Sequence, residues 1–281
     1  MTINKKNKIK NNFMLNKNVI YTKKRNRNIL KVIPRNIHRE IIGLSFPKMP
    51  FLGNDIWTLY ELSWLNSKGL PQISIGKVIF NADSKNIIES KSLKLYLHSF
   101  NKMKFDNWSD IRQILEYDLS ICTESKVYVS LFRLNEIKVQ SINHFNGYCI
   151  DEQDIEIKDY CINSNYLCGA ASNKMVKETL VSHLFKSNCP ITNQPDWASI
   201  MISYKGLSIN YEAILRYLIS FRNHNEFHEQ CVERIFNDIS YFCYPEELTV
   251  YARYTRRGGI DINPWRSNIP FAPTCLRLVR Q

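Results

Sequence analysis

The segment from residue 187 to residue 197 carries a cysteine and an aspartate on a connection that two prolines stiffen. Pro190 and Pro195 fix their own backbone angles and remove two N–H donors, so little of this segment can be regular structure. A thiolate at Cys189 suits attack on a carbonyl-like or nitrile carbon, and Asp196 could then protonate the nitrogen. The spacing alone also fits a core cysteine before a turn, because cysteine is among the most buried residue types.

A second polar segment, residues 222–230, enters an otherwise apolar helix. His228 could orient or transfer a proton near neutral pH, and a carboxylate such as Glu229 can accept two hydrogen bonds from a guanine-like N–H edge. His224 and His228 are four residues apart, as metal ligands on one helix face are, but they lack the H-E-x-x-H arrangement of zinc sites. The alternative is a solvated helix start, where acidic residues are favourable.

Two further segments add basic and capping residues. Residues 253–259 end a strand in an Arg- and Gly-rich turn, where glycines allow close approach of the backbone and arginines can clamp a phosphate. The turn does not match G-x-G-x-x-G, so it predicts no dinucleotide-binding βαβ unit, and a charged hairpin is the alternative. Residues 89–96 open a helix, and by themselves they are ordinary first-turn residues.

The elements that must position these residues differ in the period of their apolar positions. Apolar residues at every second position indicate strands, and apolar residues three or four apart indicate helices. We expect strands over residues 57–64, 73–80, 127–131, 176–186, 198–204, 248–254 and 274–279, and helices over residues 89–100, 107–119, 211–221 and 227–239. The order strand-strand-helix-helix-strand-strand thus occurs twice. Runs of strands and helices that do not alternate favour an α+β fold with antiparallel pairing.

The positive charge of the chain is concentrated at its start. The 281 residues carry a formal net charge of +12. Residues 1–40 hold eight Lys, four Arg and a single Glu, so almost all of this charge lies there. We expect residues 1–44 to form a basic, solvated and poorly ordered extension without the apolar stretch of a signal peptide. Nucleic-acid binding by this extension is the less favoured alternative, because the rest of the chain is nearly neutral.

The cysteines and the hydropathy restrict the class of protein. Eight cysteines are scattered along the chain without a C-x-x-C pair, which predicts reduced thiols in a cytoplasmic protein and no structural zinc. Hydrophobic residues make up 44% of the chain, but they form no run long enough to span a bilayer. We therefore expect a cytoplasmic protein with no membrane contact and no metal.

Together the four segments resemble one family, the NADPH-dependent 7-cyano-7-deazaguanine reductases, which are nitrile reductases of queuosine biosynthesis in the tunnelling-fold superfamily. Residues 89–96 match the family signature E-[SL]-K-[SA]-x-K-[LY]-[YFW]. Residues 189–196 resemble its nucleophile loop, F-H-E at 227–229 its base-binding segment, and R-R-G-G at 256–259 its cofactor turn. The resemblance covers about residues 45–281 and is to the long form of the enzyme, which has two modules.

This resemblance implies an architecture and a reaction. The architecture is α+β, with tandem tunnelling-fold modules over residues 45–160 and 161–281, each an antiparallel sheet with two helices on one face, in a homodimer. The reaction is a four-electron reduction of the nitrile to a primary amine, 7-aminomethyl-7-deazaguanine, with two NADPH and a covalent thioimide on Cys189. The expected partner is the small-molecule substrate, without direct binding of tRNA.

The resemblance also implies a role for each matched residue. Cys189 would be the nucleophile, Asp196 would protonate the nitrogen, and His228 would assist proton transfer. The substrate would be held by Ile88, Glu89, Ser90, His228 and Glu229, and NADPH by Ser90, Lys91, Arg257 and Gly258. No metal is implied.

Two other functions remain open from the residues. One is a non-catalytic protein of the same fold that binds a purine or pterin through Glu229 without reducing it. The other is a hydrolytic relative that resembles GTP cyclohydrolase I and needs a bound metal. The absence of a convincing Cys/His ligand set argues against the second function.

Overall fold

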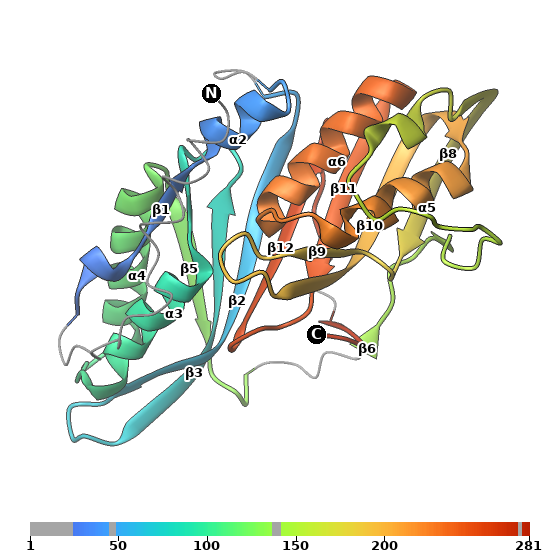
Figure 1. The fold of residues 1–281 in the computed structure, drawn as a ribbon. Helices are drawn as coiled ribbons and strands as arrows, with labels where there is room; N and C mark the ends of the chain where they lie inside the picture. The colour runs from blue at the N-terminus through green and yellow to red at the C-terminus, as the bar shows by residue number, and fades with distance from the viewer. Residues whose placement is uncertain (1–24, 45–48, 137–141, 275–276) are drawn as a thin grey trace.

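The computed structural model describes residues 25–44, 49–136, 142–274 and 277–281, and within them the chain forms one large sheet with helices packed on one face (Figure 1). The nine strands of the main sheet are β2 (Leu52–Leu65), β3 (Pro71–Asn81), β5 (Val127–Phe132), β7 (Tyr148–Cys149), β8 (Ala171–Ser182), β9 (Lys186–Asn188), β10 (Pro195–Ile209), β11 (Glu247–Tyr254) and β12 (Ile260–Ser267). Their order is β5-β3-β2-β12-β11-β10-β8-β7, with β9 paired to β10. All described pairs within this sheet are antiparallel except β7 with β8. The expected α+β architecture is confirmed.

Two helices cover each half of this sheet. In the first half, α3 (Ser90–His98) and α4 (Trp108–Thr123) pack on β2, β3 and β5, and in the second half, α5 (Tyr211–Ile219) and α6 (His228–Cys243) pack on β8, β10 and β11 (Figure 1). Sequence-local caps start these helices. Asn107 and Asp110 form a capping box on α4, and Asn210 accepts the N–H of Ala213 at 3.0 Å on α5. Each half therefore has the two helices that the sequence predicts. None of the helices in the described ranges is long and apolar enough to cross a membrane.

The two halves repeat the same contacts as well as the same order of elements. The Tyr96 hydroxyl on α3 donates to Asp118 on α4, and the Tyr217 hydroxyl on α5 donates to Asp238 on α6 at 2.6 Å. The 3₁₀ helices η2 (Ser99–Lys102) and η4 (Ser220–Asn223) continue α3 and α5 in the same way. These shared contacts support the internal repeat that the order of elements predicts.

Several strands differ from the sequence prediction. β12 was not expected, because Pro264 interrupts its pattern, yet it forms the central seam with β2, where Pro264 lies opposite Asp55. The expected strand over 176–186 is divided into β8 and β9. The predicted order places a fourth strand at the end of the first half, but the next described strand after β5, β6 (Ile142–Asn143), pairs in parallel with β13 (Arg277–Leu278) at the C-terminus.

The basic N-terminal segment is ordered where the structure describes it, so the prediction of a poorly ordered extension is wrong for residues 25–44. β1 (Val32–Pro34) pairs with β4 (Asn86–Ile88), and α2 (Arg35–Ile41) follows directly. Acidic side chains far away in the sequence explain this order. Arg25 donates to Asp118 and Arg39 to Glu233, and all of these side chains except Arg25 are buried. Residues 1–24 lie outside the described ranges.

The predicted module boundary at residues 160 and 161 lies too late in the chain. Tyr148 already pairs with Leu180 of β8, and the N–H of Ile150 donates to the carbonyl of Val181 at 2.9 Å. Ile155 also packs against the core of the second half. The change from the first half to the second therefore falls between β5 and β6. The glycines and asparagines at residues 145–175 indicate a loop, but they did not reveal this boundary. The segment has little regular structure and packs on the core of the second half.

Candidate functional site

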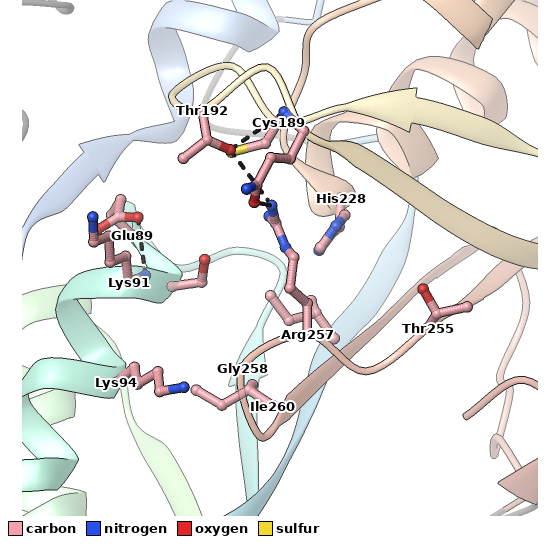
Figure 2. Close-up of a pocket in the computed structure, with 13 residues that line it drawn as sticks. Glu89, Lys91, Lys94, Cys189, Thr192, His228, Thr255, Arg257, Gly258 and Ile260 are labelled. Atoms are coloured by element: carbon pink, nitrogen blue, oxygen red, sulfur yellow. Dashed lines mark hydrogen bonds between the residues drawn. The ribbon is translucent and has the colours of Figure 1, made fainter. Parts of the chain in front are cut away.

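A cavity of about 170 Å³ lies between the two halves of the molecule, and the four motif segments line it together (Figure 2). The first half contributes the start of α3, and the second half contributes the loop before β10, the first residue of α6, and the turn between β11 and β12. The lining residues are Glu89, Ser90, Lys91, Lys94, Cys189, Thr192, Gln194, His228, Thr255, Arg257, Gly258, Ile260 and Ile262.

Cys189 sits in the cavity wall at the start of a tight loop between β9 and β10. Its N–H donates to the carbonyl of Gln194 at 2.8 Å, and its carbonyl accepts the N–H of Asn193 at 2.9 Å. Asn193 adopts a left-handed backbone with φ of 58°, which this short closure requires. Only 7% of Cys189 is exposed, but the exposed part faces the cavity. The loop therefore presents the thiol to a bound ligand and keeps it away from bulk solvent.

Asp196 lies behind the cavity wall and holds two residues that line it. It is the second residue of β10, is buried, and faces Ser187 across the pairing of β9 with β10. Its Oδ1 is 3.1 Å from Arg257 Nη2, and its Oδ2 is 3.3 Å from His228 Nε2. The structure thus brings three of the predicted site residues into one charged cluster next to Cys189.

His228 is fixed by its place in the fold while one ring nitrogen stays available. It is the first residue of α6, and its ring lies 3.8 Å from the Tyr254 ring, centroid to centroid, at 34°. His228 Nε2 and Asp196 are close enough for an ion pair but not aligned for a hydrogen bond. Among the described residues Nε2 is buried without a hydrogen-bond partner. This nitrogen therefore faces the Asp196 carboxyl, 3.3 Å away, across the cavity wall.

Glu89 has a local structural role in addition to its place in the lining. It is the N-cap of α3, and its carboxylate accepts the N–H groups of Lys91 at 2.9 Å and Ser92 at 2.7 Å. These bonds fix the first turn of α3, so that Ser90 and Lys91 reach the cavity. A ligand would contact the Glu89 carboxylate in an orientation that the helix sets.

Two of the predicted substrate residues, Ile88 and Glu229, do not line the cavity. Ile88 is buried in the core of the first half, at the end of β4. Glu229 is 3% exposed, and burial together with the charge of Asp55 raises its pKa to about 7. Glu229 follows His228 directly, and its backbone therefore starts at the cavity wall. The structure places this carboxyl beside the cavity and not in its lining.

Three cationic side chains line the cavity near the turn between β11 and β12, and we call them the basic rim. They are Lys91, Lys94 and Arg257. Gly258 and Gly259 have φ of 62° and 75°, and a Cβ at Gly259 would come within 2.2 Å of the Glu61 side chain. Only glycine fits this turn at such a close approach. Cationic side chains beside a bare backbone turn fit the phosphates of a dinucleotide.

Sequence reasoning did not assign six of the lining residues. Lys94 could have been found, because it lies three residues after Lys91 and so shares its helix face. Thr192 and Gln194 belong to the Cys189 loop, where Gln194 Oε1 accepts from Arg257 at 2.9 Å. The remaining three, Thr255, Ile260 and Ile262, flank the turn or lie on β12, whose pairing with β2 the sequence did not reveal.

The histidine pair at 224 and 228 is separated in space by its partners. His224 Nε2 lies 3.2 Å from Glu226, whereas His228 faces Asp196. Within the residues that the structure describes, no group of three or more His, Cys, Asp or Glu side chains could hold a metal ion. The observed clusters are ion pairs that can hold or move protons.

The corresponding positions in the first half carry different chemistry. The N–H of Asn66 donates to the carbonyl of Leu70 at 2.9 Å, in the same place in the repeat as the Cys189 loop. α4 begins at Trp108, where α6 begins at His228. The first half therefore lacks a thiol and an imidazole at these positions, and the molecule has one such cluster within its described parts.

Two family models match this chain, one in each of its halves. Residues 21–131 match the family model described as "Nitrile reductase, 7-cyano-7-deazaguanine-reductase N-term", and residues 195–270 match the model described as "QueF-like protein". A solved structure, the archaeosine synthase QueF-Like in the apo form, is similar at 17% identity with a TM-score of 0.30, over 35% of this chain and 99% of that chain.

Proposed function

Because this chain belongs to the QueF-type family of two-module proteins, we propose that it is an NADPH-dependent nitrile reductase of queuosine biosynthesis. Its substrate is 7-cyano-7-deazaguanine and its product is the primary amine 7-aminomethyl-7-deazaguanine. One observation carries the proposal. A thiol, an imidazole and a basic rim, which come from both halves of the chain, line a single cavity.

Cys189 acts as the nucleophile. A nitrile is a weak electrophile for hydride, and covalent capture divides one hard step into easier ones. The Cys189 thiol adds across the C≡N bond, with a new C–S bond at carbon and a proton on nitrogen, which gives a thioimide. The Cys189 loop supports this step, because it holds the sulfur in the cavity wall on a closed turn.

Asp196 and His228 manage the protons. Addition of the thiol places charge on the nitrile nitrogen, and Asp196 delivers a proton there through its position next to His228. The unpartnered Nε2 of His228 is suited to hold this proton beside the substrate. Arg257 holds the Asp196 carboxyl in place for this transfer, since the two groups are 3.1 Å apart.

The base is held by carboxylates from both halves. A deazaguanine edge presents N–H donors, for which Glu89 and Glu229 are the matching acceptors. The backbone at Ile88 and Ser90 lies beside this edge. Each carboxylate stands at the start of a helix, Glu89 before α3 and Glu229 in the first turn of α6.

The residues at the rim fit NADPH. It would be held by Ser90, Lys91, Arg257 and Gly258. The two cationic side chains would contact its phosphates, and the glycine turn would leave room for the pyrophosphate to approach the protein backbone. NADPH, when held there, would supply the two hydrides that reduction of each nitrile needs. Between the two reductions Cys189 leaves as the thiolate, and the second reduction with one more proton completes the amine. Enclosure by both halves limits hydrolysis of the intermediate imine.

We further propose that the protein works as a cytoplasmic homodimer on a small-molecule substrate and does not bind tRNA directly. Tunnelling-fold modules close their sheets by side-by-side assembly, and β5 lies at one end of the main sheet. Strand edges of this kind are satisfied by pairing with another chain. The elution volume of the purified protein with and without tRNA would test both statements.

The direct test is consumption of NADPH on addition of 7-cyano-7-deazaguanine. The wild-type protein should oxidise two NADPH for each amine formed, and Cys189→Ala should oxidise none. Incubation with the nitrile alone should add the mass of the substrate to the peptide that contains Cys189. Full turnover by Cys189→Ala would refute the mechanism, and tight binding of the base without NADPH oxidation would instead support a non-catalytic purine-binding protein.

A further inference from the structure

The N-terminal segment from Lys31 to Arg39 contacts both elements that carry the proposed base-binding carboxylates. β1 pairs with β4, which ends directly before Glu89, and the carbonyl of Lys31 accepts the N–H of Glu89 at 2.9 Å. A few residues later, α2 reaches α6, the helix of Glu229, through the ion pair of Arg39 with Glu233. The segment therefore joins the two halves of the base site.

Arg35 is the residue of this segment with the most central contacts. It is 4% exposed, and its backbone N–H donates to the carbonyl of Lys85 at 3.0 Å, just before β4. Its Nε donates to Ser84 at 3.1 Å, and its Nη2 donates to Asp55. Its Nη1 lies 3.6 Å from Glu233 of α6. One side chain thus contacts β2, the turn before β4, and α6.

These contacts belong to a buried network with more positive than negative charge. Arg266 donates to both Asp55 and Glu233 at 2.8 Å, and Arg39 donates twice to Glu233, at 2.9 and 2.6 Å. Arg35, Arg39 and Arg266 therefore face two carboxylates. Loss of one partner from a buried network leaves a charge without compensation, which is strongly unfavourable.

Glu229 is a buried carboxyl on which the charges of Asp55 and Arg35 from this network act in opposite directions. It lies one helical turn before Glu233 on the same face of α6. Burial raises the pKa of Glu229 to about 7. The charge of Asp55 on β2 acts in the same direction, and His228 on α6 and Arg35 on α2 act against it. Without Arg35, Asp55 and Glu229 would be close carboxylates with one cation fewer, and a protonated Glu229 cannot accept two N–H groups of a base.

We propose that Arg35 is a positioning residue of the base site, which holds β4 and α6 in register and offsets the charge of Asp55, its ion-pair partner. The segment that composition marks as a basic tail is then part of substrate recognition. This inference rests on the proposed function for the identity of the base and for the role of Glu229.

The test measures the affinity for 7-cyano-7-deazaguanine as a function of pH in a Cys189→Ala background, where the base binds without covalent capture. The wild-type background should bind more tightly as the pH rises through about 7, where Glu229 ionises. Arg35→Gln should raise the Kd about tenfold and move the midpoint of this pH dependence upward. Arg35→Lys keeps the charge but not the fork of donors, so it should restore the midpoint and only part of the affinity.

Arg25→Gln is the matched control. Arg25 precedes this segment and also forms an ion pair with a buried acid, Asp118, but its partners Asp118 and Tyr96 lie on α4 and α3 and not on β4 or α6. It should lower the Tm without changing the Kd or the pH midpoint. The Kd of NADPH, measured in parallel, should stay within twofold for all variants, because the network lies away from the basic rim.

The outcomes separate this inference from the proposed function. If the Cys189→Ala background does not bind the base, the proposed function fails and this inference fails with it. If that background binds the base and folded Arg35→Gln binds with the same Kd and pH midpoint, only this inference is overturned. Should Arg35→Gln not fold, Arg35→Lys decides, and an unchanged Kd for that variant would overturn the proposal.

Discussion

Buried acidic residues on α6 have pKa values that move in opposite directions, and the difference lies in their partners. Burial alone would raise the pKa of Glu233, but Arg266 and Arg39 outweigh it and lower the pKa to about 2. Burial also raises the pKa of Glu229, and there the partners do not compensate, so the pKa reaches about 7. Glu233 is therefore fixed as an anion, whereas Glu229 can change its charge near neutral pH.

The charge of Glu229 predicts a pH dependence of stability. A carboxyl whose pKa is higher in the folded state binds its proton more tightly there, so its contribution is present at low pH and is lost as the pH rises from about 4.3 to about 7. Glu229→Gln has no such loss. The Tm of this variant relative to wild type should rise with pH across this window in thermal unfolding, and a constant difference would contradict the assignment.

Asp196 predicts a kinetic effect that differs from a general loss of stability. Asp196→Asn removes the carboxyl group that lies between His228 and Arg257. In the proposed mechanism this carboxyl delivers the proton that capture of the nitrile needs. The mass shift at Cys189 should therefore appear about 100-fold more slowly. Asp151→Asn is the control, because Asp151 also accepts two hydrogen bonds in the second half, from Ser182 and His183. Equal rates for the two variants would remove Asp196 from the mechanism.

At the scale of elements, the turn between β11 and β12 shows why glycine is required beside a charged site. Gly258 lies against Lys94, with 3.0 Å between a Cβ at that position and Nζ, and Gly259 lies against Glu61. Lys94 Nζ is 3.7 Å from Glu61 Oε2. The two glycines of this turn therefore pack on the ion pair of Lys94 and Glu61. Lys94 belongs to the basic rim, and Arg257, also in the rim, directly precedes Gly258.

Gly259→Ala should lower the Tm by more than the strain of a left-handed alanine backbone alone would, because the added Cβ also meets Glu61. Gly43 has the same φ of 75° but has no atom within 4 Å of an added Cβ, so Gly43→Ala measures the backbone cost, about 1 kcal/mol. Gly259→Ala adds a close contact with Glu61 and displaces Lys94. We expect a larger fall in Tm for Gly259→Ala and a higher Kd for NADPH, whereas Gly43→Ala should leave that Kd unchanged.

At the scale of the whole molecule, the sequence predicts elements better than it predicts which elements meet. The helices and most strands follow from period and caps, and the segments that carry Cys189 and Arg257 line one cavity. The order of residues 25–44 was missed, because the acids that neutralise this segment, such as Glu233, lie almost 200 positions away. β12 was missed because Pro264 interrupts its strand pattern. Its partner, β2, is also about 200 positions away in the chain.

The seam between β2 and β12 joins the halves, so a change there should affect the site from a distance. Gly53 lies opposite Arg266 in this seam, and a Cβ would come within 2.4 Å of the Trp265 carbonyl and 2.8 Å of Arg266 Cδ. Gly53→Ala should lower the free energy of unfolding by about 2 kcal/mol. It should also raise the Kd of the base, since Arg266 belongs to the buried network of Asp55 and Glu233 that packs beside Glu229.

Gly76→Ala is the control for this seam, since Gly76 lies within the first half, opposite Leu59. A Cβ there would lie 3.2 Å from the movable end of the Leu59 side chain. We expect a smaller loss of stability in denaturant unfolding and no change in the Kd of the base. If both variants weaken base binding equally, the effect arises from general loosening of the sheet. If only Gly53→Ala weakens it, assembly of the two halves through β2 and β12 sets the geometry of the site.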